Sequence, residues 1–167
     1  MTHDGLAIRS FGAGDEDALW AILEPMIRAG ETYPLPRDWS RDETLAYWTA
    51  PEKTVLLAEN AKSGDTWGTY YLRPNNQGGG AHVCNCGFVT APAARGKGVA
   101  GAMCRHAMEH ARKAGYRAMQ FNFVVATNEG AIALWQRHGF EIVGRLPGAF
   151  DHPSHGEVDA LVMYQHL

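Results

Sequence analysis

The chain has 167 residues and a formal net charge of −3, with 46% hydrophobic and 20% charged residues. These values predict one folded domain over residues 1–167, argue against a disordered chain, and give no reason to expect nucleic acid as a partner. No signal-peptide pattern and no apolar run of membrane-spanning length is visible, so we expect a cytoplasmic protein without a membrane partner.

The first half of the chain predicts a strand, two helices and a hairpin. Residues 6–11 alternate apolar and polar side chains, which favours a strand. Asp15 and Glu16 open a helix that ends at Gly30, and a loop with two prolines follows over residues 31–36. The apolar residues at helical spacing are Leu19, Ile22, Leu23, Met26 and Ile27. The remaining elements are a helix over 42–49 and strands over 54–59 and 66–73.

The second half predicts alternating strands and helices. A glycine-rich loop over 75–80 is followed by an apolar strand over 83–90 and an amphipathic helix over 99–114. The helix buries a stripe formed by Val99, Met103, Ala107, Ala111 and Ala114. Further elements are a strand over 118–125, a helix over 129–138 with Asn128 as its N-cap, and strands over 140–143 and 159–165. This order predicts a mixed α/β fold.

The turn between the strand over 83–90 and the next helix has the properties of a pyrophosphate-binding site. The first backbone N–H groups of a helix have no intrahelical acceptor, and glycines allow a phosphate to approach the main chain. Arg95 and Lys97 add positive charge. The residues of this turn are Arg95, Gly96, Lys97, Gly98, Val99 and Ala100.

Two common phosphate ligands fit this turn poorly. Gly96, Gly98 and Gly101 satisfy the dinucleotide pattern G-x-G-x-x-G. That pattern also needs an acidic residue at the end of the next strand to hold a ribose, and residues 124–127 at that place include none. A nucleoside-triphosphate P-loop requires Ser or Thr after its lysine, whereas Gly98 follows Lys97. Another phosphate-bearing ligand is therefore expected.

Two motifs identify a family that the chain resembles. Arg95, Gly98 and Ala100 match the pattern Q/R-x-x-G-x-G/A of the GCN5-related N-acetyltransferases (GNAT family). A second motif of that family, N-x-x-A-x-x-L-Y-x-x-x-G-F, is matched downstream by Asn128, Ala131, Leu134, Trp135, Gly139 and Phe140, with Trp in place of Tyr. The resemblance implies a single GNAT domain. Its fold would be one mixed, mostly antiparallel sheet of about six to seven strands flanked by four helices, with a V-shaped splay between the fourth and fifth strands.

The resemblance also implies acetyl-CoA as co-substrate and no metal. The amides of Arg95, Gly96, Lys97, Gly98, Val99 and Ala100 would hold its pyrophosphate. The strand backbone near Phe88 and Val89 would pair with the pantetheine arm, and Asn128 would form a hydrogen bond to that arm. In this family the tyrosine at position 135 protonates the departing thiolate. Trp135 cannot do so at neutral pH, because an indole N–H is not acidic enough.

A closer resemblance lies in the segments 82–88, 120–124 and 144–149, which are similar to fungal acetyltransferases that detoxify proline analogues such as azetidine-2-carboxylate. Asn85 and Asn122 correspond to residues that bind the substrate or the reacting centre in that group. The implied activity is N-acetylation of a small-molecule amine, such as an amino acid or a proline-like toxic analogue. Acetylation of a protein, peptide or antibiotic is an alternative, and so is a non-catalytic acyl-CoA-binding module.

Two loops contain further candidates for the acceptor site. Glu31, Thr32 and Tyr33 follow the first helix, where this family builds its acceptor pocket, although an exposed loop would have the same composition. Asp151, His152 and His155 belong to the predicted loop before the last strand and have the same two interpretations. The C-terminal strands, with Leu161, Val162 and Met163, would permit a homodimer.

The remaining histidines and cysteines do not predict a metal site. His82, Cys84 and Cys86 share one face of a strand, but no second pair at ligand spacing accompanies them, so with Cys104 we expect reduced thiols. His106 and His110 occupy positions i and i+4 of a predicted helix without the glutamate of a metalloprotease motif, and solvated side chains are expected.

Overall fold

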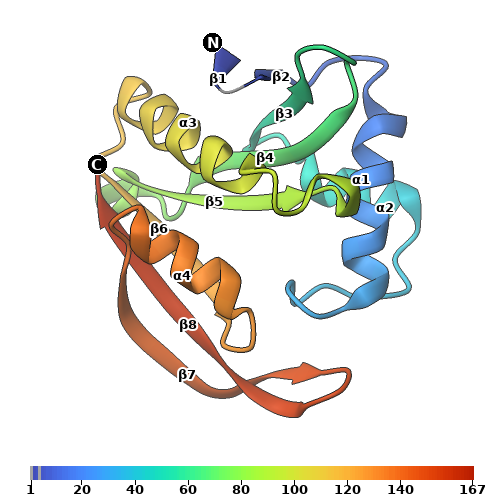
Figure 1. Ribbon diagram of the computed structural model, residues 1–167. Coiled ribbons are helices and arrows are strands. Elements are labelled where there is room, and N and C mark those ends of the chain that lie inside the picture. The colour runs from blue at the N-terminus through green and yellow to red at the C-terminus, as the bar shows by residue number, and fades with distance from the viewer. Residues whose placement is uncertain (1, 4) are drawn as a thin grey trace.

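The computed structural model describes residues 2–3 and 5–167, whose strands form one eight-stranded sheet in the order β1-β2-β3-β4-β5-β6-β8-β7 (Figure 1). The strands are β1 (Thr2–His3), β2 (Leu6–Ser10), β3 (Thr54–Asn60), β4 (Thr66–Pro74), β5 (Val83–Thr90), β6 (Ala118–Val125), β7 (Glu141–His152) and β8 (Gly156–His166). The α-helices are α1 (Glu16–Ala29), α2 (Arg41–Trp48), α3 (Val99–Lys113) and α4 (Glu129–Arg137). Within the described residues β5 and β6 run parallel and the other neighbours antiparallel, so the predicted fold is confirmed. The strand beyond the expected number is the two-residue β1.

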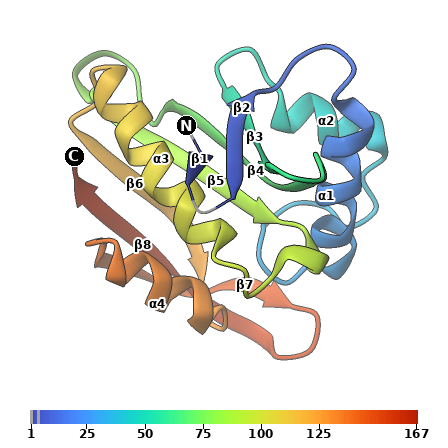
Figure 2. The same ribbon diagram turned by 45° about the horizontal axis from the view of Figure 1, so that its top comes forward.

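The helices cover both faces of the sheet because successive strand residues point to opposite sides. Helices α1 and α2 pack on the face that presents Leu57 and Tyr71, and Trp48 lies at the centre of that core. Helix α3 and the neighbouring α4 pack on the opposite face, over Tyr70 and Leu72 (Figure 2). Among the described residues no helix is both long enough and apolar enough to cross a membrane.

The strands β5 and β6 separate after only three residue pairs. The register joins Val83 to Ala118, Cys84 to Met119 and Asn85 to Gln120, and no further pair follows. Beyond that point β6 contains a bulge between Phe121 and Val124, which bends it away from β5. We call the space between the diverging strands the gap. Counted from β2, these are the fourth and fifth strands, so the predicted splay is confirmed.

The C-terminal hairpin is longer than the sequence pattern predicts. The expected strands over 140–143 and 159–165 are parts of β7 and β8, which pair from Glu141–Tyr164 to His152–Gly156. Asp151 and His152 therefore end a strand rather than lie in a loop, and His155 alone occupies the turn. A register shift between Leu146 and Phe150 accommodates Pro147, which would otherwise interrupt the pairing.

Two expectations about α3 are wrong. Ala114 is exposed, because it is the C-cap rather than a member of the buried stripe. His106 is half-buried instead of solvated, and its Nδ1 lies 2.7 Å from the hydroxyl of the fully buried Tyr70. Burial lowers the pKa of His106, and the nearby His110 adds to this effect. His106 thus supplies the hydrogen-bond partner that the buried phenol needs.

Candidate active site

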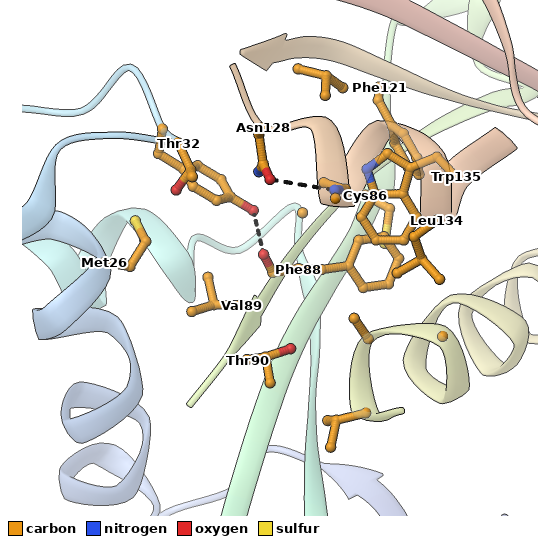
Figure 3. A pocket seen from close by; sticks show the side chains of 18 of the residues that line it. Met26, Thr32, Cys86, Phe88, Val89, Thr90, Phe121, Asn128, Leu134 and Trp135 are labelled. Carbon is orange, nitrogen blue, oxygen red and sulfur yellow. Dashed lines mark hydrogen bonds between the residues drawn. The ribbon is translucent and has the colours of Figure 1, made fainter. Parts of the chain in front are cut away.

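One cleft of about 1190 Å³ extends from the gap to the N-terminus of α3. Figure 3 shows its central part, between the loop after α1, strand β5 and helix α4. The predicted CoA-binding residues, the three loop candidates after α1 and the two asparagines all line this cleft. They are Glu31, Thr32, Tyr33, Asn85, Phe88, Val89, Arg95, Gly96, Lys97, Gly98, Val99, Ala100, Asn122, Asn128 and Trp135.

The turn before α3 presents open backbone to the cleft. Gly96 and Gly98 have φ angles of +75° and +78°, and a Cβ at either would meet no atom within 4 Å. The amides of Arg95 and Lys97 donate to Pro92 and Ala94 within the turn, so these two residues offer their side chains. Within the described part of the chain, no acceptor is recorded for the amides of Gly96, Gly98, Val99, Ala100 and Gly101. Their N–H groups and the helix dipole fit a pyrophosphate.

Strand β5 has a free edge along the gap. The carbonyl of Val83 and the amide of Ala91 bond on the β4 side, at Asn75 and Trp67. Because backbone groups alternate along a strand, those of Cys86 and Phe88 face the gap, and those of Val89 face β4. Phe88 and Val89 were the residues expected to supply main-chain groups to the ligand. The structure places the backbone groups of Phe88 at the gap but not those of Val89, and it adds Cys86, which the sequence did not identify.

Tyr33 connects the loop after α1 to this free edge. Its hydroxyl donates to the Phe88 carbonyl at 3.0 Å, drawn as the dashed line at Phe88 in Figure 3. Its ring packs edge-on against Trp48, 5.8 Å between centroids. Burial raises the pKa of Tyr33 well above its usual value, so the phenol remains a donor at neutral pH. The loop after α1 is thereby held against β5.

Asn85 occupies the point where β5 and β6 stop pairing. Its Nδ2 donates to the Gln120 carbonyl at 3.0 Å, and its Oδ1 lies 3.4 Å from the Arg73 Nε. The side chain is 6% exposed. Asn85 thus ties β6 to β5 through its side chain at the last residue pair of the ladder, and it contacts an arginine from β4 on the same face of the sheet.

Asn122 lies in the β6 bulge, which turns it toward the cleft. Its Oδ1 accepts from Gln120 Nε2 at 2.9 Å, and its Nδ2 donates to Asn75 Oδ1 at 2.7 Å. The structure therefore brings Asn85 and Asn122 together through Gln120, whose carbonyl serves one and whose side chain serves the other. The amides can orient polar groups of a ligand, but neither is a base.

Aromatic rings form the α4 side of the cleft. Trp135 is 8% exposed, with ring centroids 5.0 Å from Phe88 and 5.1 Å from Phe121 (Figure 3). Phe140 stacks on Phe121 at 4.2 Å, and Trp135 and Phe140 belong to the same buried cluster. Asn128 caps α4 through Oδ1, which accepts from Ala131 at 3.4 Å. Asn128 also lines the cleft, and within the described residues no acceptor is recorded for its Nδ2.

The opposite wall consists of tyrosines from α2 and β4. Tyr71 packs edge-on against Trp48 at 4.9 Å and lies over Gly87, where a Cβ would be 2.6 Å from the Tyr71 ring. The Lys53 Nζ lies 3.5 Å from the ring centroid of Tyr47 and 4.5 Å from that of Tyr71. The absence of a side chain at Gly87 thus makes room for an aromatic wall directly above the free edge of β5.

The tip of the β7–β8 hairpin and the loop after α1 lie on either side of the mouth of the gap. A smaller cavity of about 270 Å³ is lined by Glu31, Thr32, Thr127, Asn128, His152, Ser154 and His155. His152 is 7% exposed, and its Nδ1 accepts from the Ser154 amide at 3.2 Å. Two of the three weaker candidates, His152 and His155, are therefore next to the loop candidates, and Asp151 lines neither cavity.

The cysteines are buried thiols rather than reactive groups. Burial raises the pKa of Cys84 and Cys104 to about 12, and it raises that of Cys86 well above the usual value. Among the described residues no group of three or more His, Cys, Asp or Glu side chains could hold a metal ion.

The sequence missed Arg73, Tyr71 and Asn75, which belong to β4 or follow it. The sequence did offer a signal for these residues. The predicted strand over 66–73 precedes the strand over 83–90, which carries Asn85, so the two strands could have been expected to pair. The register that pairs Arg73 with Asn85 and Tyr71 with Gly87 could not be obtained from that pattern alone.

Comparison with known proteins finds one family over most of the chain. The profile described as "Acetyltransferase (GNAT) family" matches residues 18–140. The curated "N-acetyltransferase aca1" of Schizosaccharomyces pombe is 29% identical over 156 residues, which cover 84% of this chain and 75% of that protein.

Solved structures show the same architecture. A GCN5-related N-acetyltransferase from Kribbella flavida is 36% identical and superposes with a TM-score of 0.91, covering 98% of this chain and 99% of that one. A phosphinothricin acetyltransferase from Sinorhizobium meliloti, solved in complex with acetyl-CoA, is 20% identical with a TM-score of 0.84. That alignment covers 98% of this chain and 89% of the other.

Proposed function

Because this chain belongs to the GNAT family of acetyltransferases and uses acetyl-CoA, we propose that its acceptor is a small-molecule amine, such as an amino acid or a proline-like analogue. The observation that carries this proposal is the covered acceptor side of the cleft. Tyr33 anchors the loop after α1 to β5, and the hairpin tip around His152 lies against the same loop. A polypeptide acceptor would need an open groove at this place.

The site residues divide into two groups by the ends of the cleft that they occupy. At the α3 end, the open amides near Gly96 and Gly98 and the side chains of Arg95 and Lys97 would hold the pyrophosphate of acetyl-CoA. The free edge of β5 at Phe88 would hold its pantetheine arm, with Asn128 on the other side. Acetyl-CoA supplies the activated acetyl group as a thioester.

At the gap end, the residues of this chain would bind and orient the amine. Asn122, held by Gln120 and Asn75, presents an amide beside the free edge of β5. Among the described residues of the cleft walls, neither asparagine can remove a proton, so an acceptor would bind as the free amine or lose its proton to water. The indole of Trp135 excludes water by packing on Phe88 and is not assigned a proton-transfer step.

A non-catalytic acyl-CoA-binding module is the alternative of another class, and acetylation of peptides or antibiotics is the alternative within enzymes. A thiol-release assay with acetyl-CoA would test these readings. The acceptor panel should include azetidine-2-carboxylate, phosphinothricin and peptides with free N-termini. We expect release with a small amino acid and none with the peptides. Tight CoA binding without turnover on any amine would overturn the enzymatic proposal.

We further propose that residues 1–167 form a single domain, supported by the continuous sheet from β1 to β7. A cytoplasmic location is supported by three buried free cysteines. A homodimer through the C-terminal hairpin is supported by the exposed Ile142, Val143 and Leu146 on β7, which are 42%, 59% and 39% exposed.

A further inference from the structure

We infer that the acceptor carries a carboxylate close to its amine, and that Arg73 binds this carboxylate and determines specificity. The inference rests on the proposed function and adds the residues that distinguish an amino acid from a simple amine. It is carried by the position of Arg73 in the cleft and by the charges around it.

Arg73 is held at the closed end of the gap. It pairs in register with Asn85 and lines the cleft, and its Nε lies 3.4 Å from the Asn85 Oδ1. A guanidinium has five N–H donors, of which this contact uses one. Among the described residues no carboxylate lies within 4.0 Å of Arg73, and its terminal nitrogens have no recorded hydrogen bond. The planar end of the side chain is available for a ligand.

A second cation, Lys53, does not line the cleft itself but lies over the ring of Tyr71, which does. Lys53 precedes β3, donates to the Tyr47 carbonyl, and is positioned over the rings of Tyr47 and Tyr71. Burial lowers its pKa to about 8, and the charge of Arg73 contributes, against a smaller opposing effect of Glu52. Like Arg73, Lys53 has no ion pair among the described residues.

Two neighbouring cations in a partly buried site repel each other, and a bound anion removes this cost. Arginine is suited to the task because its two parallel N–H groups match the two oxygens of a carboxylate. The tyrosine walls exclude water and strengthen the interaction. The closed end of the gap is therefore an anion site built by this chain's own residues.

The distance along β5 favours a small acceptor. A strand advances about 3.3 Å per residue, so Asn85 and Phe88 are about 10 Å apart along the chain. The Arg73 side chain extends from the Asn85 end, and the free edge at Phe88 marks where the acetyl donor would lie. An anion bound by Arg73 then leaves room for only a few bonds before the amine, as in an amino acid.

The test compares an acid with its neutral isostere. Thiol release is measured with azetidine-2-carboxylate and azetidine-2-carboxamide for the wild type, Arg73→Gln and Arg73→Lys. The control is Arg112→Gln, an exposed arginine on the solvent side of α3. Folding is checked by thermal unfolding, and CoA affinity by calorimetry.

We expect the wild type and Arg112→Gln to prefer the acid by at least about 30-fold in kcat/KM, the effect of losing one partner of a buried charge pair. In Arg73→Gln the acid-to-amide ratio should fall toward one, with partial recovery in Arg73→Lys and unchanged CoA affinity. Equal turnover of acid and amide by the wild type would overturn the inference while leaving the acetyltransferase proposal intact. An equal loss for both acceptors in Arg73→Gln would also overturn it, because Arg73 would then only support Asn85.

If no acceptor in the panel is turned over, binding decides the matter separately. The melting temperature of the CoA-loaded protein is measured with each compound. Stabilisation by the acid alone, lost in Arg73→Gln, supports the anion site even though the proposed turnover has failed. Absence of any shift in the wild type overturns the inference.

Discussion

Substitution of Gly87 by alanine tests the wall of the acceptor site directly. The added Cβ would lie 2.6 Å from Cε1, 2.7 Å from Cζ and 2.9 Å from the hydroxyl of Tyr71, where ordinary contact begins at 3.4 Å. Tyr71 has little room to move, because it is 5% exposed and packs against Trp48. Overpacking of this kind costs about 1–3 kcal/mol, and the melting temperature of a chain this size falls by about 2–4 °C per kcal/mol.

The sign of the change in stability distinguishes a clash from the ordinary effect of replacing glycine by alanine. Without the clash, Gly→Ala inside a strand should stabilise the protein by about 0.5–1 kcal/mol, because glycine loses more conformational entropy on folding. We therefore expect Gly87→Ala to lower the melting temperature and raise the acceptor KM, with CoA affinity retained. The control Gly79→Ala, where a Cβ meets nothing within 4 Å, should have a melting temperature at or slightly above the wild-type value. A melting temperature for Gly87→Ala at or above the wild-type value would refute the reasoning.

A double variant separates the clash from other causes. Removing the ring in Gly87→Ala/Tyr71→Ala eliminates the atoms that the new Cβ would meet. The double variant should be less destabilised than the two single variants combined, since the contacting pair is coupled. Additive losses in free energy of unfolding would show that Gly87 is required for a reason unrelated to Tyr71.

Three further predictions follow from the site. Asn122→Ala should lower kcat by about 10²-fold, the scale for one oriented donor, with little change in CoA affinity; parallel losses in both would contradict its assigned position. Tyr33→Phe should cost about 0.5–1.5 kcal/mol in unfolding free energy, by loss of the hydrogen bond to Phe88, and raise the acceptor KM; an unchanged melting temperature would count against the anchoring role. Lys53 is charged below its pKa of about 8 and neutral above it. The ratio of the wild-type kcat/KM for a carboxylate acceptor to the kcat/KM of Lys53→Arg should therefore decline as pH rises through 8. The groups facing Lys53 are Arg73, Glu52, Tyr47 and Tyr71, and a flat ratio from pH 7 to 9.5 would contradict its role.

The proposed CoA-binding end of the cleft was predictable because the features that define it are local. Open amides, glycines with positive φ and two cations all occur within six consecutive residues at the start of α3. The Asn128 cap and Trp135 lie on one short helix. Such features depend on the chain's own backbone conformation, so the pattern of residue types identifies them without knowledge of the fold.

The predicted length of the strand at 140–143 and the predicted solvation of His106 were wrong, because each depends on a partner elsewhere in the chain. The strand over 140–143 extends to His152 because β8 continues alongside it, and the apolar pattern of β7 alone does not show this. His106 was assigned to a solvated face, but Tyr70, 36 residues earlier, provides a buried hydrogen-bond partner. The error at His106 comes from a contact between residues far apart in the chain, and the error at β7 comes from a hairpin pairing that the residue pattern of one strand does not specify.

The sequence by itself determined the order of helices and strands, the turn proposed to bind phosphate and the family, because these depend on hydrophobic periodicity and on contiguous motifs. Only the tertiary structure added Arg73 and Tyr71 to the proposed acceptor site. Arg73 reaches the gap because β4 pairs with β5 in a register that aligns it with Asn85, and Tyr71 forms a wall because that register sets it over Gly87. Register is a long-range property, and a shift of one residue would point both side chains to the other face of the sheet.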